Sequence, residues 1–332
     1  MKIAVIGAGI AGLSCARHLQ AAGLNVEVFE KSRGPGGRCS TRRGDGWQAD
    51  HGAQYFTARD ARFRALVARL RADGVVAPWE AHIVSIAPDG SCAPLSNATE
   101  RFVGTPRMSA IGRWLAEGLA VHYETRVEAL VADPAGWRLL TSGEPAGPYA
   151  AVVVSLPAAQ SSALLLEVAP ELSDIAAGCA MESCHALIAR YASDPGLPFD
   201  AAFINTGMLS WVARDSSKPG RPAGHTWVLH APTSVAAYDA PAEQVIEDML
   251  EAFGRLGAPR PDALTLHRWR FARNVAGDDR GALWAPARRL GLASDWLHGG
   301  RIEGAWLSGL QLAERLLAAP PATLAQRSNS TP

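Results

Sequence analysis

The chain has 332 residues with 32 basic and 32 acidic side chains, so its formal net charge is zero. Its hydrophobic content of 48% and charged content of 19% are those of a globular protein and exclude a disordered chain. Neutrality also removes the overall positive charge expected of a nucleic-acid-binding protein. The length exceeds one typical domain of roughly 100–200 residues, which predicts two domains or one large elaborated domain.

Cysteine usage and hydropathy bear on the compartment. The five cysteines include no CxxC pair, so we expect free thiols rather than a disulfide framework or a metal site. No stretch approaches the roughly 18 consecutive apolar residues of a membrane span. The apolar residues after Lys2 resemble a short signal peptide, but the glycines among them favour a different explanation. We expect a cytoplasmic protein with no membrane or nucleic-acid partner, as a monomer or a homodimer.

A strand, a glycine-rich turn, a helix and a second strand are predicted at the start of the chain. Residues 2–6 form an apolar run typical of a buried parallel strand, and residues 13–22 are rich in helix formers. Residues 25–29 form the second strand, which ends at Glu30. Glu30 follows the last glycine of the turn by 18 residues, close to the spacing of an acid that binds a ribose diol.

The turn itself reads Gly7-Ala8-Gly9-Ile10-Ala11-Gly12. Gly7 permits a tight turn, Gly9 lets a pyrophosphate approach the backbone, and Gly12 lets the helix pack closely on the sheet. The N–H groups at the helix N-terminus then face the phosphates. This context predicts a dinucleotide-binding unit; an ordinary glycine-rich turn is the alternative.

Residues 30–41 distinguish FAD from NAD. They read Glu-Lys-Ser-Arg-Gly-Pro-Gly-Gly-Arg-Cys-Ser-Thr, and NAD enzymes do not usually follow the acid with a Gly-Gly-Arg turn. The segment resembles the glutathione-reductase-type flavoproteins, which include the amine oxidases. In them the glycines and the arginine wrap the FAD pyrophosphate, so the resemblance implies that Gly37 and Arg38 contact non-covalently bound FAD. A solvated surface charge is the alternative for Arg38.

Residues 50–57 narrow the resemblance. They read Asp-His-Gly-Ala-Gln-Tyr-Phe-Thr and resemble the bacterial renalase-like flavoproteins. In that family the stretch runs along the flavin, which implies that residues 52–55 contact the cofactor. His51 has the chemistry of a general base, but its neighbours favour a structural role in the loop.

The middle of the chain predicts a second domain. Residues 60–72 have apolar side chains at helical spacing, with Asp60 as the N-cap. Short strands within 184–230 and a helix over 242–256 are typical of an α+β domain with an antiparallel sheet. The resemblance places His230 near the flavin ring and Trp269 in the substrate pocket. An ordinary strand histidine and a half-buried strand tryptophan are the alternatives.

Two further segments carry the resemblance. In this class the residue matching Val127 touches the adenine through its backbone. At the C-terminal end, a strand over 290–293 leads into Ser294-Asp295 and then into a helix that ends at residue 317. In the family a Gly-Asp pair brings the acid to the ribityl or pyrophosphate, and the helix N-terminus faces the flavin O2 region, where its dipole stabilises negative charge. Ser294 departs from the usual glycine.

Together these inferences predict a set of site residues. The predicted cofactor-binding residues are Gly7, Gly9, Ala11, Gly12, Glu30, Lys31, Gly37, Arg38, Gly52, Ala53, Gln54, Tyr55, Val127, Asp295, Ile302, Gly304 and Ala305. The predicted catalytic residues are His230 and Trp269, and no metal is expected.

The predicted fold class is α/β plus α+β, with a Rossmann-type FAD-binding domain and a discontinuous substrate domain built on an antiparallel sheet. The FAD-binding domain is predicted over residues 1–74, 104–167 and 276–318. The substrate domain is predicted over residues 75–103 and 168–275, followed by a disordered tail over 319–332.

The resemblance implies an FAD-dependent oxidase that converts 2- or 6-dihydro isomers of NAD(P)H into NAD(P)+. Hydride would pass to flavin N5, and dioxygen would reoxidise the flavin and yield hydrogen peroxide. One alternative is an amine oxidase, many of which hold a water near N5 with a lysine. Of the three lysines only Lys218 is eligible, and its Ser-Ser-Lys-Pro-Gly loop is a poor setting for a rigid group. The second alternative is a non-enzymatic FAD-binding sensor or scaffold.

Overall fold

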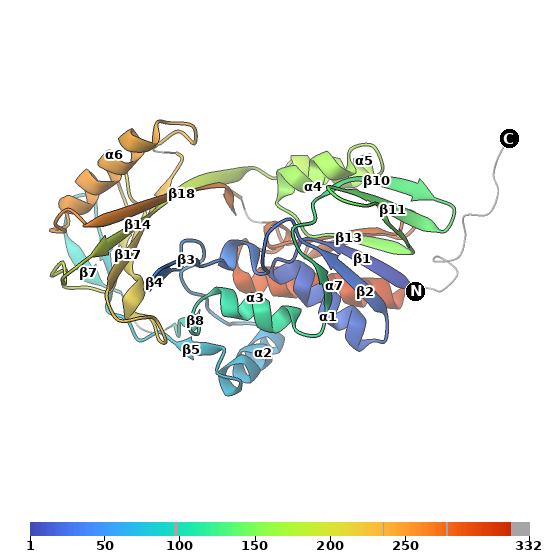
Figure 1. Ribbon diagram of the computed structural model, residues 1–332, viewed down its shortest axis with the longest axis horizontal. Helices are drawn as coiled ribbons and strands as arrows, with labels where there is room; N and C mark the ends of the chain where they lie inside the picture. Colours follow the sequence, from blue (N-terminus) through green and yellow to red (C-terminus); the bar gives the residue numbers. More distant parts are fainter. Residues whose placement is uncertain (96–98, 235, 277, 320–332) are drawn as a thin grey trace. The chain divides into compact units, whose positions relative to one another are not determined.

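The computed structural model describes residues 1–95, 99–234, 236–276 and 278–319, and the chain divides into two compact units (Figure 1). Unit 1 contains residues 1–37, 112–181 and 274–332, and unit 2 contains residues 38–111 and 182–273. Except for residue 319, the tail predicted to be disordered lies outside the described residues.

Unit 1 is built on a six-stranded sheet. Its strands lie in the order β19 (Ala282–Ala285), β20 (Leu290–Ala293), β13 (Ala151–Val154), β1 (Lys2–Ile6), β2 (Asn25–Phe29) and β9 (Ala120–His122). Neighbours from β20 to β9 are parallel, and β19 pairs antiparallel at the edge. The strands at the centre are buried along almost their whole length, as their continuous apolar runs predict.

Helices and a small second sheet cover this sheet. Helices α1 (Ile10–Ala21) and α7 (Ile302–Ala318) lie side by side (Figure 1). Helix α1 contacts β1 and β2, whereas α7 contacts β19 and β20. The small antiparallel sheet comprises β10 (Val127–Asp133), β11 (Gly136–Thr141) and β12 (Ala146–Tyr149). It shares an apolar core with α4 (Ala158–Leu165) and α5 (Pro170–Ala177). The 3-10 turn η3 (Asp295–Leu297) precedes α7, and α3 (Ser109–Ala116) runs from unit 2 into unit 1.

Unit 2 is built on a seven-stranded sheet. Its strands lie in the order β18 (Ala263–Asn274), β14 (Met181–Tyr191), β17 (His225–Pro232), β16 (Trp211–Arg214), β15 (Ala201–Ile204), β6 (Ile83–Ile86) and β7 (Cys92–Pro94). The pairs from β14 to β15 and the β6–β7 pair are antiparallel, whereas β15 and β6 are parallel. The predicted fold class, a Rossmann-type domain with a discontinuous second domain on a largely antiparallel sheet, is confirmed.

The two faces of this sheet have different cover. Helix α6 (Ala242–Gly254) packs on one face through an apolar core. On the other face, the hairpin of β3 (Arg42–Gly44) and β4 (Trp47–Ala49) packs against Ile188 and Val228. The shorter elements are α2 (Ala61–Ala72), β5 (Val76–Pro78), β8 (Phe102–Gly104) and the 3-10 turns η1 (Gly37–Cys39) and η2 (Asp215–Ser217). Asp60 is the N-cap of α2 as predicted, and its carboxylate accepts from the N–H groups of Arg62 and Phe63.

The compact units differ from the predicted domain ranges over residues 38–74, 104–111, 168–181 and 274–275. Residues 38–74 and 104–111 belong to unit 2, whereas the sequence grouped them with the FAD-binding domain. Packing explains the difference: the β3–β4 hairpin lies on the large sheet of unit 2, and β8 pairs with β5. Residues 168–181, predicted in the substrate domain, belong to unit 1 because α5 packs against α4.

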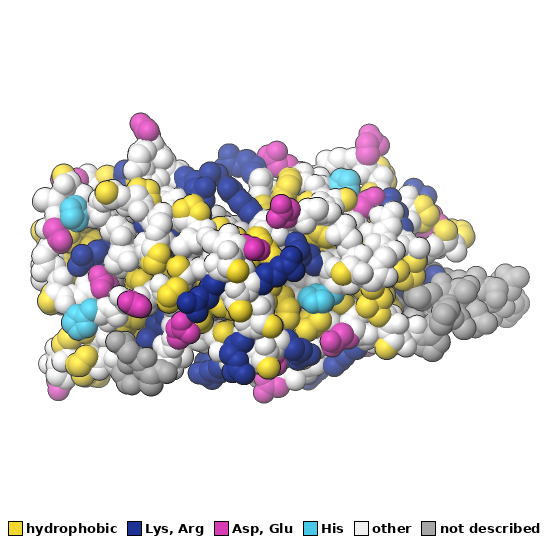
Figure 2. Space-filling model, turned by 90° about the horizontal axis from the view of Figure 1, so that it is seen from below, with side chains coloured by type: hydrophobic (Ala, Val, Ile, Leu, Met, Phe, Trp, Pro, Cys, Tyr) yellow, Lys and Arg dark blue, Asp and Glu magenta, His cyan; other side chains and the backbone are white. Residues whose placement is uncertain are grey.

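Surface and composition features are ordinary. On the face shown in Figure 2, basic side chains occur in several groups with acidic side chains among them. Within the described ranges, no helix is long and apolar enough to cross a membrane. In the same part of the chain, no group of three or more His, Cys, Asp or Glu side chains could hold a metal ion. All five cysteines are free thiols.

Candidate functional site

The glycine turn of unit 1 has the geometry that the sequence predicts. Gly7 has φ +103°, and a Cβ there would collide with the carbonyl of Ser155. A Cβ at Gly12 would collide with the carbonyl of Gly7 and lie 3.1 Å from Cβ of Ser155, so α1 packs too closely for a side chain. A Cβ at Gly9 would meet nothing within 4 Å. The turn therefore leaves open space at Gly9, where a pyrophosphate is predicted.

Gly9 is also the N-cap of α1, and a glycine has no side chain with which to cap the helix. The first backbone N–H groups of α1 are therefore available to an anion at the position that Gly9 leaves open. Predicted residue Ala11 lies in the first turn of α1, against α7.

Glu30 holds the end of β2 to the glycine turn. One carboxylate oxygen accepts from the N–H of Ala8 at 2.8 Å, and the other accepts from the N–H of Ser32 at 2.8 Å. Each oxygen keeps a lone pair with which it could accept from a ribose hydroxyl. Lys31 is exposed beside it. The N–H of Thr125 donates to the carbonyl of Glu30 at 2.9 Å, which brings the start of β10, and with it Val127, next to the end of β2.

The second glycine segment of unit 1 packs on the first. The N–H of Gly36 donates to the carbonyl of Ala8 at 2.8 Å, and a Cβ at Gly37 would lie 3.5 Å from Cα of Gly9. Gly112 in α3 was not predicted, yet a Cβ there would lie 2.6 Å from Cα of Gly36. In the sequence, Gly112 is recognisable only as a glycine inside a predicted helix, which indicates close packing but does not identify the segment that packs there.

The C-terminal motif of unit 1 brings Asp295 and the start of α7 together. Asp295 is buried in η3, and the Ser294 hydroxyl donates to its carboxylate at 3.0 Å. Ser294 has φ −163°, an extended conformation that any residue adopts, so the missing glycine causes no strain. Ile302 begins α7, and a Cβ at Gly304 would collide with the carbonyl of His298. Ala305 is buried in the next position.

In unit 2 the two predicted catalytic residues meet at one carbonyl. His230 Nε2 lies 3.1 Å from the His51 carbonyl oxygen, and Trp269 Nε1 donates to the same oxygen at 2.9 Å. Because a carbonyl only accepts, the proton of neutral His230 lies on Nε2. The rings of His51 and Trp269 stack at 5.1 Å, and His267 lies edge-on to both, at 4.6 and 4.5 Å.

We call His51, His230, His267 and Trp269 the aromatic–imidazole cluster. Burial, with smaller contributions from His267 and Arg42, lowers the pKa of His51 from 6.5 to about 4. Burial, with the charge of Lys218, lowers the pKa of His230 to about 4 as well. Burial and Arg42 also lower the pKa of His267. The cluster is therefore uncharged at neutral pH, and the charged groups that act on it are cationic.

His51 and His267 are the members of this cluster that sequence reasoning did not assign to the site. His51 was given a structural role, and its carbonyl does join the other residues. His267 lies two positions before Trp269 on β18, so strand alternation puts both on the same face of the sheet.

The loop of residues 50–55 is held from within unit 2. A Cβ at Gly52 would collide with the carbonyl of Arg38, and the N–H of Ala53 donates to that carbonyl at 2.9 Å. The Arg38 guanidinium donates to the carbonyl of Ala272 at 3.1 Å. The Tyr55 ring lies 5.7 Å from that of Trp211.

The nitrogen and the oxygen of the Gln54 side-chain amide both have hydrogen-bond partners within unit 2. Its amide nitrogen donates to the carbonyl of Asp50 and, at 3.1 Å, to that of Gly52, while its oxygen accepts from Lys218 Nζ at 3.1 Å. Both N–H groups of the amide are therefore in use.

Lys218 corrects an expectation. Its loop was judged a poor setting for a rigid group, but the side chain is fully buried. Nζ lies 2.7 Å from Asp215 Oδ1 and 3.6 Å from Asp50 Oδ2. Arg221 also pairs with Asp50, so the four residues form a buried network of two cations and two anions.

The charges in this network shift one another. Burial alone would raise the pKa of Asp50, but Lys218 and Arg221 hold it below its usual value. Burial and the neighbouring Asp50 raise the pKa of Asp215. Asp50 is further held by the Thr41 hydroxyl at 2.6 Å and the N–H of Met108 at 3.0 Å.

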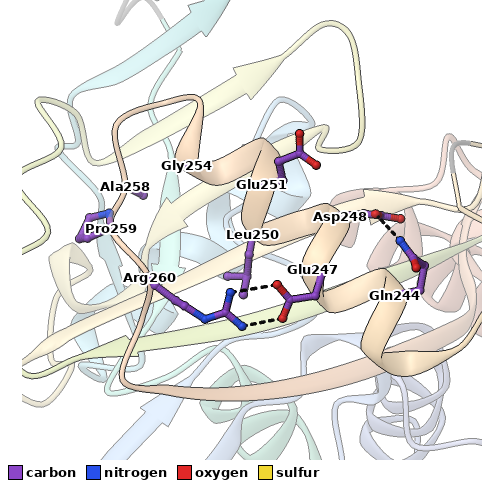
Figure 3. A pocket seen from close by; sticks show the side chains of 9 residues that line it. All are labelled: Gln244, Glu247, Asp248, Leu250, Glu251, Gly254, Ala258, Pro259 and Arg260. Atoms are coloured by element: carbon purple, nitrogen blue, oxygen red, sulfur yellow. Dashed lines mark hydrogen bonds and ion pairs between the residues drawn. The ribbon is translucent and has the colours of Figure 1, made fainter.

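A surface hollow of about 480 Å³ lies elsewhere in unit 2, between α6 and residues 258–260 (Figure 3). Three of its side chains are acidic, Glu247, Asp248 and Glu251, and Arg260 pairs with Glu247 at 2.5 and 2.9 Å. None of its lining residues is a predicted site residue.

Comparison with known proteins assigns the chain to a family. A model of the flavin-containing amine oxidoreductases matches residues 90–317, and one of NAD(P)-binding Rossmann-like domains matches residues 5–70. The chain belongs to the flavin-containing amine oxidoreductase family. It is therefore a flavin-dependent oxidoreductase of that family that binds FAD, as predicted. The open position at Gly9 and the uncapped N-terminus of α1 fit such a cofactor.

Solved structures share the fold at low identity. Wild-type putrescine oxidase bound to putrescine is 15% identical with a TM-score of 0.75, over 96% of this chain and 100% of that one. Cyclohexylamine oxidase from Brevibacterium oxydans IH-35A is 12% identical with a TM-score of 0.73, over 95% of this chain and 98% of that one. An oxidoreductase from Methanosarcina mazei is 15% identical with a TM-score of 0.70, over 95% and 100%. These likenesses concern the fold alone.

Curated relatives match over shorter segments. The zeta-carotene-forming phytoene desaturase of Myxococcus xanthus is 49% identical over 51 residues, 15% of this chain and 10% of the relative. The tRNA 5-methylaminomethyl-2-thiouridine biosynthesis bifunctional protein of Magnetococcus marinus is 28% identical over 215 residues, 53% of this chain and 32% of the relative. The chain thus spans about a third or less of the length of these relatives.

Proposed function

We propose that this flavoprotein oxidises 2- or 6-dihydro isomers of NAD(P)H to NAD(P)+. Bound FAD supplies the hydride acceptor, and its reoxidation by dioxygen yields hydrogen peroxide. The substrate is a small dinucleotide whose nicotinamide ring carries the hydride and whose phosphates carry negative charge.

The electrostatics of the aromatic–imidazole cluster carry this proposal. The cluster is uncharged at neutral pH chiefly because burial lowers the pKa values of its histidines, and the cations Arg42 and Lys218 add smaller contributions in the same direction. Lys218 is neutralised within its buried network, whereas the side chain of Arg42 is exposed. An anionic dinucleotide is attracted by such a site, and an ammonium substrate is repelled.

The proposed roles of Trp269 and His230 follow from their shared hydrogen-bond acceptor. Each ring is fixed by its bond to the His51 carbonyl, so neither rotates freely. A fixed flat indole and a fixed neutral imidazole would hold a dihydronicotinamide ring in one orientation before reaction. Hydride transfer requires no proton removal from the ring, so an uncharged cluster with low pKa values suits this chemistry.

We propose that the ADP part of FAD is held by unit 1. The N–H groups of α1 and the glycine backbone around Gly9 would bind the pyrophosphate, and Glu30 would accept from a ribose diol. The predicted contacts of Arg38 and residues 52–55 of unit 2 remain proposals. The Gln54 side-chain amide already donates to the carbonyls of Asp50 and Gly52 within the loop. The groups to probe first for contact with FAD are therefore the backbone N–H of Gln54 and the atoms of Tyr55.

Anaerobic reduction of the purified holoprotein tests the reaction. The protein is mixed with 2-dihydro-NAD, 6-dihydro-NAD, ordinary NADH and a panel of amines, and bleaching of the flavin absorbance is followed. We expect rapid bleaching by at least one of the two isomers and slow or no bleaching by ordinary NADH. Rapid bleaching by an amine and by neither isomer would overturn the proposal.

Amine oxidation is the second candidate, because the model that matches residues 90–317 describes amine oxidoreductases. The buried Lys218 does not serve it, since its side chain has no exposed surface and its ammonium faces Gln54, Asp215 and Asp50. The same bleaching experiment decides between the two substrates, and no bleaching by any reductant would favour a non-enzymatic flavoprotein.

A further inference from the structure

Lys218 occupies an unusual position in a chain that otherwise uses arginine. Only three of the 32 basic residues are lysines, and the other two, Lys2 and Lys31, belong to unit 1. Lys218 is thus the single lysine in the sequence of unit 2, and it is fully buried. Codon usage that favours arginine does not explain a lysine at this position.

The surroundings of Lys218 suit an ammonium better than a guanidinium. Three acceptors lie around Nζ: Asp215 at 2.7 Å, Gln54 at 3.1 Å and Asp50 at 3.6 Å. An ammonium has three donors around one atom, whereas a guanidinium is a planar fork that pairs best with two parallel acceptors. Arg221 supplies the fork in the same network, against Asp50.

The Lys218–Gln54 contact determines the orientation of the Gln54 amide. With Oε1 turned toward Lys218, Nε2 faces the carbonyls of Asp50 and Gly52. These two carbonyls flank His51 on both sides. The carbonyl of His51 in turn accepts from both His230 and Trp269.

We propose that Lys218 is a positioning residue that acts through Gln54 to hold the His51 carbonyl, and with it His230 and Trp269, in one orientation. It does not touch substrate, because its side chain is fully buried. The structural part of this proposal is independent of the proposed function, whereas the expected effect on the rate of flavin reduction rests on that function. Without the Lys218 contact the Gln54 amide is free to reorient, and the two rings lose their common acceptor geometry.

The test keeps the buried charge balanced, because removing one cation alone would leave a buried anion unpaired and could unfold the protein. The variant Lys218→Met with Asp215→Asn removes the donor to Gln54 and leaves the Asp50–Arg221 pair intact. Asp215→Asn alone is the matched control, since it keeps Lys218 beside Gln54. It removes one buried anion, but Asp50 still pairs with both Lys218 and Arg221, so neither cation is left without a partner. Both are studied as holoproteins with FAD bound.

The first readout needs no substrate. In protein with 15N-labelled histidine, the Nε2 proton of His230 is followed by NMR at neutral pH. We expect a resolved resonance in the wild type and in Asp215→Asn, and its loss through exchange with water in Lys218→Met/Asp215→Asn. A resonance that is unchanged in the double variant would overturn the positioning role, whatever the enzyme oxidises.

The second readout is the anaerobic rate of flavin reduction by whichever reductant bleaches the wild type. We expect the double variant to reduce its flavin on the order of 10²-fold more slowly than Asp215→Asn, with KM changed by less than about threefold, because ring misplacement affects the reacting geometry more than binding. Adding Gln54→Met should slow it by less than about threefold more, because Lys218 acts through Gln54. Equal rates in the double variant and its control would refute the catalytic consequence, and bleaching by amines alone would refute only the proposed substrate.

Discussion

The low pKa values of His51 and His230 predict that unit 2 loses stability in mild acid. Each imidazole has a pKa of about 4 in the folded protein, against 6.5 for an unperturbed histidine. Between these two values the unfolded chain binds a proton that the folded chain does not. Stability is therefore fully present above pH 6.5 and is lost as the pH falls toward 4.

The magnitude follows from the two pKa values. On lowering the pH from 7.5 to 5.5, each imidazole costs about 1.3 kcal/mol of unfolding free energy, and the two together cost about 2.7 kcal/mol. His267, whose pKa is also lowered, acts in the same direction. The raised pKa of Asp215 acts in the opposite direction, since its folded form binds a proton more readily.

Variants separate these contributions. His51→Gln removes one imidazole from the cluster, and His82→Gln removes an exposed imidazole from the same unit as the control. Urea unfolding of each holoprotein is followed by far-UV circular dichroism at pH 7.5 and 5.5. We expect the loss between the two pH values to be about 1.3 kcal/mol smaller in His51→Gln than in the wild type, because the other groups cancel in the difference.

One result of this comparison would contradict the reasoning about the pKa of His51. If His51→Gln loses as much stability between pH 7.5 and 5.5 as the wild type does, then burial does not hold His51 neutral. The same result would remove the electrostatic argument for an anionic substrate, since that argument requires an uncharged cluster.

Four further predictions concern single positions. Gly9→Leu should fold normally but be purified without yellow colour, because its side chain fills the space predicted for the pyrophosphate; retained FAD would refute that placement. Gly309→Val should lower the free energy of unfolding in urea by about 3 kcal/mol or more, because a Cβ would lie 2.8 Å from Cβ of Ser14 and 2.9 Å from N of Cys15, and a near-neutral effect would contradict the α1–α7 packing. Asp60→Ala should cost about 1 kcal/mol in the same assay through loss of the α2 cap, and no loss would argue against the cap. Arg42→Met should raise KM for the dihydro isomer on the order of fivefold, equivalent to about 1 kcal/mol, while Arg43→Met on the neighbouring strand position should not; equal effects would exclude a specific role for Arg42.

Local patterns predicted the N-terminal βαβ unit because every determinant lies within one short stretch. Gly7, Gly9 and Gly12 each have a role that depends on the adjacent strand and helix. The structure shows the tight turn at Gly7 and the close packing at Gly12, and it leaves open space at Gly9. The Asp60 cap was predictable for the same reason, since its acceptors are the next residues along the chain.

Contacts that close over long sequence separations were not predictable in this way. Gly309 and Gly112 lie in no motif, and each is required only because another backbone passes close by, at α1 and at Gly36. The assignment of residues 38–74 to unit 2 likewise depends on Trp47 and Ala49 packing against Ile188 and Val228, distant strand residues.

The position of Lys218 was also not predictable from the sequence, because it depends on contacts with distant segments. Its local sequence of small residues, proline and glycine indicated a poor setting for a rigid group, and that interpretation was wrong because the side chain is buried. The residue is buried because Asp50 and Gln54, 164 or more positions earlier in the chain, lie beside it. A charged residue in a loop is thus compatible with a fixed position when its partners come from a distant segment, and only the folded chain supplies those partners.

Gln54 adds the converse point. The motif predicted Gln54 as a cofactor contact, yet both N–H groups of its amide and its carbonyl oxygen have partners within unit 2. A resemblance identifies which positions matter but not which atoms act, because the same glutamine could serve a ligand or its own loop. Here the amide serves the loop, so any contact of residue 54 with FAD must use the backbone or a remaining lone pair of Oε1. The N–H groups of the amide are directed at the carbonyls of Asp50 and Gly52, on either side of His51.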